Sequence, residues 1–223
     1  MTKQVEPKKQ SGFKPVWDGL KFSGRILFHP FDGFWDMKHE RRGNRYAAAL
    51  IVAALTLTFA AKGQLTGFLF NFTDDLEFNL FYKITSVLLP FFIWCVANWC
   101  ITTLVDGEGS FGDIAMVTAY AVVPLVIIQL PLVLLGHVIT LQEQPFYQIL
   151  DAVSVLWFAL LLFCGILTIH QFSVGKTILT IGIAVLGMVI LLFLVLLFLS
   201  LIQQMGGFLR ILLNEIQLIV QSS

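Results

Sequence analysis

Five long segments of the chain are almost free of charged residues, and each is long enough to cross a lipid bilayer. They lie at about residues 46–69, 80–105, 114–139, 148–168 and 178–202. A membrane-spanning helix needs about 20 predominantly apolar residues because the hydrocarbon core is about 30 Å thick. Charged residues make up 13% of the chain, which is about half the share in soluble domains. The sequence therefore predicts an all-α membrane protein with five transmembrane helices.

Positive charge is concentrated near the N-terminus. Ten of the fourteen lysines and arginines lie within residues 1–45, although the net charge of the chain is zero. Lys and Arg are enriched on the cytoplasmic side of membrane proteins. We therefore expect a multi-pass protein of the cell membrane with a cytoplasmic N-terminus. Five crossings then place the C-terminus on the extracytoplasmic side.

The pattern divides the chain into three regions. Residues 1–45 form a cytosolic N-terminal region, residues 46–203 form the five-helix transmembrane domain, and residues 204–223 form an amphipathic C-terminal tail. In the tail, apolar and polar residues fall on opposite faces of a helix, which is typical of a helix at the outer interface or on a partner's surface.

Two amphipathic helices are predicted in the N-terminal region. The first covers residues 13–28, and its spacing fits a helix on the inner leaflet as well as a helix packed on the protein's own cytosolic side. The second covers residues 31–40, begins after Pro30 and has Gly43 as its expected C-cap.

A glycine-rich acidic stretch, residues 106–113, connects the second and third spans on the cytoplasmic side. Its glycines allow a sharp reversal, and Asp113 suits the start of the next helix. The topology brings this stretch to the same face as the His170–Thr177 turn and the N-terminal arginines. The candidate cytoplasmic interaction surface comprises Asp106, Glu108, Asp113, His170, Lys176, Arg41, Arg42 and Arg45. It is either a structural latch or a docking surface for another protein.

Few polar residues lie deep in the predicted spans. Asn98 and Gln129 are expected to form hydrogen bonds between helices. Lys62 is expected to extend outward to the membrane surface. The other ionisable residues fall near helix ends, whereas a transporter usually keeps such groups near the middle of the membrane.

The sequence carries no recognisable catalytic or metal-binding pattern. The three cysteines lie in apolar segments without a CxxC or Cys/His cluster, so no metal site is expected. Residues 175–177 read Gly-Lys-Thr, but His170 occupies the position where a phosphate-binding loop needs glycine. Ser110 and His137 are predicted near opposite membrane faces, so they cannot pair. We expect no enzyme activity and no cofactor.

Short motifs along the chain carry a resemblance to a known family. They are Thr66-Gly-Phe68, Phe70-Asn71, Asn98-Trp99, Thr103-Leu104, Asp106-Gly-Glu-Gly-Ser-Phe111, Tyr120, Pro124, His170-Gln171-Phe172 and Gly175-Lys176. In this order and spacing, from about residue 28 to residue 204, the chain resembles the Yip family of multi-pass membrane proteins, in its bacterial branch. The resemblance implies five helices and a cytosolic N-terminus, but no chemistry. Eukaryotic relatives are associated with Rab GTPases, a partner that a bacterial cell lacks.

The first hypothesis is a non-enzymatic scaffold or accessory subunit of a larger membrane complex, such as a transporter. Its expected partners are the lipid bilayer and other integral membrane proteins, including transporter subunits, and no nucleic acid. One alternative is a small transport or channel protein that acts as a homo-oligomer, for which Gln129 between Pro124 and Pro131 is the discriminating residue. Another is a lipid-binding or membrane-shaping protein that uses the basic N-terminal helices.

Overall fold

The computed structural model describes residues 13–65, 80–135 and 143–222, and within these ranges the regular structure is helical. The helices are α1 (Phe13–Phe28), α2 (Pro30–His39), α3 (Arg45–Leu65), α4 (Leu80–Leu104), α5 (Phe111–Ala121), α6 (Val123–Leu135), α7 (Gln144–His170) and α8 (Val174–Ser222). The motif pieces at 66–71, the predicted end of the first span and His137 lie outside the described residues.

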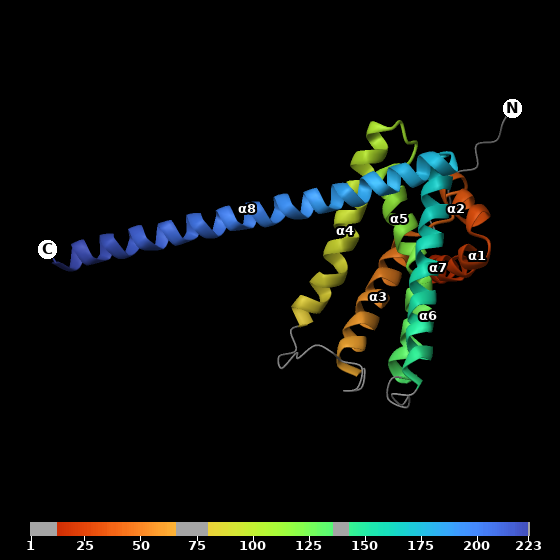
Figure 1. Cartoon of the computed structure of the whole chain (residues 1–223), viewed down its shortest axis with the longest axis horizontal. Helices are drawn as coiled ribbons and strands as arrows, with labels where there is room; N and C mark the ends of the chain where they lie inside the picture. Colours follow the sequence, from red (N-terminus) through yellow and green to blue (C-terminus); the bar gives the residue numbers. More distant parts are fainter. Residues whose placement is uncertain (1–12, 66–79, 136–142, 223) are drawn as a thin grey trace.

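The prediction of an all-α membrane protein with five apolar spans is confirmed. The five stretches long and apolar enough to cross a membrane are Arg45–Lys62, Phe81–Leu104, Phe111–Leu135, Gln144–His170 and Val174–Leu212. In Figure 1, α3, α4, the α5–α6 pair and α7 run alongside one another as a bundle, and α8 runs across them.

The third span consists of two helices rather than one. α5 ends at Ala121 and α6 begins at Val123, and the Val122 N–H bonds back to the Thr118 carbonyl. Pro124 explains the break because it has no N–H for the helix ladder and its ring crowds the carbonyl one turn earlier. Pro90 and Pro131 lie inside helices that continue through them.

The core of the bundle surrounds α5. Tyr120 is fully buried, and its hydroxyl accepts a hydrogen bond from the Asn44 backbone N–H at 3.3 Å. Gly165 of α7 permits a close crossing because a Cβ there would lie 2.4 Å from Val117 Cγ1 and 3.2 Å from Phe34 Cζ. The core therefore joins α2, α5 and α7.

The N-terminal helices pack on the protein itself. Ile26 of α1 is fully buried, and a Cβ at Gly19 would lie 2.6 Å from the Ala47 side chain of α3. Of the two interpretations of residues 13–28, packing on the protein's own surface is confirmed for this face. The aromatic rings of Trp17 and Phe28 lie on the other side and are 54% and 71% exposed.

The second N-terminal helix ends earlier than the sequence indicated. Its C-cap is Glu40, and Arg41 adopts a left-handed conformation with φ 51°. Gly43 is therefore not the C-cap. A glycine is needed there for a different reason, since a Cβ at this position would lie 2.6 Å from Met37 Cγ.

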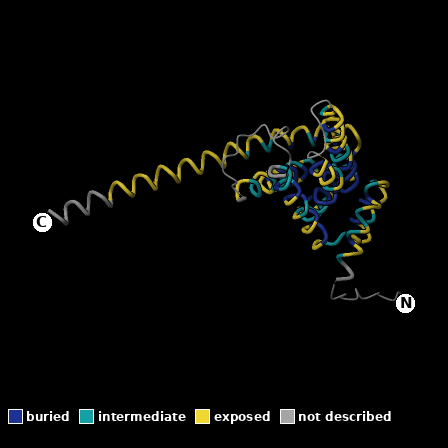
Figure 2. Tube along the Cα trace, turned by 90° about the horizontal axis from the view of Figure 1, so that it is seen from below, coloured by how far each residue is buried: buried dark blue, intermediate teal, exposed yellow. Residues whose placement is uncertain are grey.

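The last span and the tail form one continuous helix, so the expected boundary at residue 204 is not a helix end. α8 has 49 residues, which corresponds to about 73 Å, more than twice the thickness of the hydrocarbon core. Its first part packs on α4, with Gly187 close to Ala97 and Ile101. Residues 192–212 are exposed on every side, as the uninterrupted exposed stretch in Figure 2 shows. Side chains beyond Leu212 lie outside the description.

Candidate functional site

Most of the predicted interaction residues gather at one end of the bundle, which we call the basic end. It is formed by α1, α2, the 40–44 linker, the 105–110 loop and the 171–173 turn. Figure 1 shows the N-terminal helices, the α4–α5 connection and the start of α8 toward this end. The charge distribution predicts that it faces the cytoplasm.

The 105–110 loop is closed by a capping box. Ser110 Oγ accepts the Asp113 backbone N–H at 3.3 Å, and Asp113 Oδ2 accepts the Ser110 backbone N–H at 3.0 Å. This reciprocal arrangement satisfies free donors at the start of α5 and confirms the expected placement of Asp113. The left-handed residue of the loop is Asp106, with φ 54°, rather than a glycine. Asp106 is exposed.

The loop glycines serve instead to cover His170. A Cβ at Gly107 would lie 2.5 Å from His170 Nδ1, and a Cβ at Gly109 would lie 2.7 Å from Cε1 of the same ring. The imidazole is 1% exposed, its Nδ1 accepts the Gly109 N–H at 3.2 Å, and the ring stacks on Phe172 at 5.2 Å between centroids. His170 thus holds the loop against the end of α7.

The contacts that hold the 105–110 loop against α2 and α7, which we call the basic-end latch, include an ion pair of Lys38. Lys38 was not among the interaction residues predicted from the sequence. Lys38 Nζ donates to Glu108 Oε2 at 2.9 Å and to the Ile169 carbonyl at 2.7 Å. The hydrogen bond and the charge of Lys38 lower the pKa of the exposed Glu108 carboxyl. Lys38 follows the buried Phe34 by one helical turn, and that position on the packed face of α2 was the signal that could have identified it.

The remaining predicted basic residues do not join Glu108. Arg42 Nε lies 2.6 Å from Glu40 Oε2, and its Nη1 lies 3.9 Å from Asp36 Oδ2. Lys176 Nζ lies 4.2 Å above the Phe172 ring. Arg41 and Arg45 are exposed and form no ion pair within the described ranges. The structure therefore brings together Glu108 and His170 but not all eight predicted residues.

A second polar cluster lies inside the opposite half of the bundle and includes Gln129, for which the sequence predicted interhelical hydrogen bonds. Lys62 Nζ donates to Asp151 Oδ1 at 2.7 Å and to Gln129 Oε1 at 2.8 Å. Gln129 Nε2 donates to Asp151 Oδ1 at 2.6 Å and to Ser154 Oγ at 2.9 Å. We call these four residues the Lys62 cluster. It links α3, α6 and α7.

The cluster corrects one expectation and supports another. Lys62 turns into the bundle instead of extending outward, because a carboxylate and an amide are available there to replace its water. Gln129 forms the interhelical hydrogen bonds that were predicted for it. Asp151 lies seven residues from the start of α7, or about 10 Å along the helix, and Lys62 is the last residue of the span Arg45–Lys62. An ionisable residue, Asp151, is therefore present within a span.

Asn98 does not follow its predicted role. Its side chain is fully buried, and neither its amide nitrogen nor its oxygen has a hydrogen-bond partner in the part of the chain that the structure describes. The indole N–H of Trp94, one turn earlier on α4, is also buried without a hydrogen-bond partner in the described part of the chain. The backbone oxygen of Asn98 accepts a hydrogen bond from Thr102 Oγ1 at 2.8 Å.

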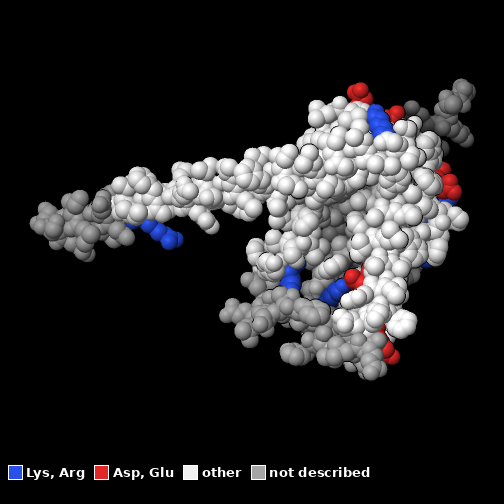
Figure 3. Space-filling view, in the orientation of Figure 1, with Lys and Arg blue, Asp and Glu red and all other residues white. Residues whose placement is uncertain are grey.

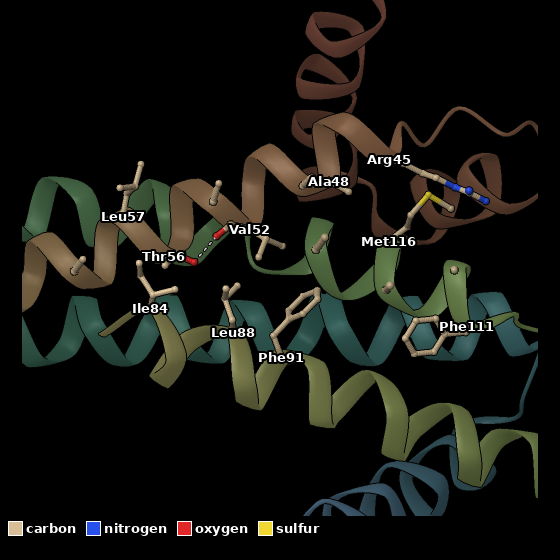
Figure 4. Close-up of a pocket in the computed structure, with 16 residues that line it drawn as sticks. Arg45, Ala48, Val52, Thr56, Leu57, Ile84, Leu88, Phe91, Phe111 and Met116 are labelled. Atoms are coloured by element: carbon tan, nitrogen blue, oxygen red, sulfur yellow. Dashed lines mark hydrogen bonds between the residues drawn. The ribbon is translucent and has the colours of Figure 1, made fainter. Parts of the chain in front are cut away.

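An apolar groove of about 790 Å³ runs between α3, α4 and α5. Figure 4 shows its side chains in two rows, from Leu57 and Ile84 at one end to Arg45 and Phe111 at the other. It is lined by Arg45, Ala48, Ala49, Val52, Ala53, Thr56, Leu57, Ala60, Ile84, Leu88, Phe91, Phe111, Gly112, Ala115, Met116 and Ala119. In Figure 3 the molecule is hollowed beneath α8, on the side of α4 that faces the bundle.

The described ranges contain no group of three His, Cys, Asp or Glu side chains arranged to hold a metal ion. Within these ranges, the basic-end latch and the Lys62 cluster bring together polar side chains from several helices, whereas the groove between α3, α4 and α5 is apolar.

Comparison with known proteins gives one match. The model of the Yip1 domain matches residues 24–201, from α1 to the exposed part of α8. No curated protein and no solved structure matches the chain. The matched range covers most of the chain and agrees with the motif resemblance, so the chain belongs to the Yip1 domain family.

Proposed function

We propose that this Yip1 domain protein is a non-enzymatic scaffold or accessory subunit of a larger membrane complex, with a transporter as the favoured type of complex. In this proposal it lies in the cell membrane with the basic end in the cytoplasm. Its partners are other integral membrane proteins. The bacterial branch of the family is the setting in which we place it.

The observation that supports this proposal is the outer part of α8, which we call the α8 arm (residues 192–212). All of its residues are exposed, and together they extend about 32 Å, the length of a membrane span. Apart from Ser200, Gln203, Gln204 and Arg210, the side chains of the arm are apolar or absent, and a helix of this composition belongs in lipid or among other apolar helices. The arm therefore offers a full span's length of surface for contacts outside this chain.

Two glutamines on the arm favour protein over lipid as its neighbour. Gln203 and Gln204 are exposed, and neither side chain forms a hydrogen bond within the described residues. Lipid tails cannot bond to an amide, whereas an adjacent helix can, with a gain of about 1–2 kcal/mol in model peptides. A partner helix beside these residues would satisfy them.

The test is extraction of the tagged protein from its native membrane in mild detergent, followed by quantification of every protein retained at near-equal stoichiometry. We expect a defined set of membrane subunits with the wild type. The variant carrying both Gln203→Leu and Gln204→Leu should lose most of that set because the amides that bind it are gone.

The matched control is Gln148→Leu, which removes an exposed glutamine from α7 instead. It should retain the same subunits as the wild type. Recovery of the chain alone, or equal retention by all three proteins, would contradict the proposal.

Transport by the protein itself is a second candidate, and the Lys62 cluster favours it. An ionisable residue inside a span, here Asp151 paired with Lys62 at the end of another span, is a feature of ion and proton pathways. The discriminating experiment measures proton and potassium flux in vesicles that contain only this protein. A flux that Gln129→Leu abolishes would establish transport and overturn the accessory role; no flux above protein-free vesicles is the result that the accessory role predicts.

A further inference from the structure

We propose that the groove between α3, α4 and α5 binds one acyl chain of an anionic phospholipid from the leaflet at the basic end, with the lipid phosphate on Arg45. This binding site is independent of the accessory function and of the α8 arm. It rests on the lining, the dimensions and the charge of the groove.

The lining is suited to hydrocarbon. Its side chains are apolar except for Arg45 and Thr56, and the Thr56 hydroxyl already donates to the Val52 carbonyl at 2.9 Å. Figure 4 shows this bond within the α3 wall. The lining between Thr56 and Arg45 therefore offers no free side-chain donor or acceptor to a polar ligand. A molecule bound there gains free energy mainly from the burial of apolar surface.

The groove is open along one side. Its floor includes the buried residues Ala48 and Ala119, whereas Ala49, Ala53 and Leu88 along the rim are exposed. A chain within the bilayer can therefore enter sideways from the lipid, without passing through the bundle.

The length of the groove suits an alkyl chain. From Arg45 to Ala60 the groove follows α3 for about 22 Å at a rise of 1.5 Å per residue. The length exceeds one leaflet's hydrocarbon depth of about 15 Å, so an acyl chain can lie in the groove over its whole depth.

The positive charge of Arg45 at one end of the groove favours an anionic headgroup. Arg45 is the charged residue of the lining and forms no ion pair with the rest of the described chain. Asp113, which follows the lining residue Gly112, is engaged in the capping box. An arginine fork binds a phosphate through paired hydrogen bonds. Arg41 lies close by in sequence and adds to the positive field that favours an anionic lipid.

The experiment titrates delipidated protein in detergent with phosphatidylglycerol, phosphatidylcholine or a free fatty acid, and counts bound molecules by native mass spectrometry. We expect one tightly held phosphatidylglycerol, bound at least tenfold more tightly than phosphatidylcholine. Free fatty acid bound as tightly as phosphatidylglycerol would overturn the phospholipid assignment, because a carboxylate would then suffice.

Two variants and two controls separate the contributions of the groove and the arginine. Ala53→Phe fills the groove and should weaken phosphatidylglycerol binding at least tenfold, whereas Ala159→Phe, an exposed alanine of α7, should not. Arg45→Gln should abolish the preference for the anionic lipid, whereas Arg41→Gln should retain most of it.

Folding is monitored by thermal unfolding in the same detergent. If Ala53→Phe does not fold, Ala49→Phe on the same rim provides the same test. Equal binding by the groove variant and Ala159→Phe would refute the groove as the acyl site. Equal headgroup preference in Arg45→Gln and Arg41→Gln would refute Arg45 as the phosphate ligand.

Discussion

Removing one partner of the Lys62–Asp151 pair leaves an uncompensated charge inside the helix bundle. The loss of one member of a fully buried ion pair costs about 3–5 kcal/mol, whereas a surface pair contributes about 0–1 kcal/mol. The side chains here are 26% and 37% exposed, so the pair lies between these limits but closer to the first. Lys62→Met should therefore destabilise the protein by about 2–3 kcal/mol, and Asp151→Leu by a similar amount.

The decisive comparison is the double variant, Lys62→Met with Asp151→Leu. Because both charges are then absent, apolar packing replaces the pair, and the net cost should be within about 1 kcal/mol of the wild type. The coupling free energy of the cycle should be about 2 kcal/mol or more. Equilibrium unfolding in mixed micelles with increasing denaturing detergent measures all four proteins. Additive costs, or single costs below about 1 kcal/mol, would refute the conclusion that this pair joins α3 to α7.

Two further predictions concern the basic end. Lys38 lowers the pKa of Glu108 below its ordinary 4.5, so the stabilisation of the folded protein by this ion pair is fully present above that pH and is lost as the pH falls through the lowered pKa. The thermal midpoint of the wild type should therefore drop more below pH 4.5 than that of Glu108→Gln. Parallel curves of thermal midpoint against pH would count against the latch. Gly109→Ala places a Cβ 2.7 Å from the His170 ring and should cost about 1–3 kcal/mol. The control Gly112→Ala, where the nearest atom lies at 3.8 Å, should unfold nearly as the wild type does.

The features that depend on residues close together in the sequence were predicted correctly. The apolar run lengths identified the five spans, and the spacing of residues 13–28 gave the bounds of α1. Ser110 and Asp113 stand three residues apart, which is the spacing that a capping box requires, and Asp113 was expected at the helix start.

The errors arose where a partner distant in sequence decides the outcome. Lys62 was expected to seek water because its own helix offers it no partner, but Asp151, 89 residues away, lies beside it once α3 and α7 pack. Lys38 was likewise paired by a loop residue 70 positions away. The last span was predicted to end at residue 202 and the amphipathic tail to begin at residue 204, whereas backbone hydrogen bonding continues through Gly206 and Gly207.

The α8 arm carries the proposed function, and photo-crosslinking in native membranes tests it most directly. A photoreactive amino acid is placed at Phe198 on the arm, which is 62% exposed, or at Leu156 on α7, which is 71% exposed. We expect a discrete adduct with another membrane protein from position 198 and only lipid adducts from position 156. Lipid adducts alone from both positions would contradict the proposed function.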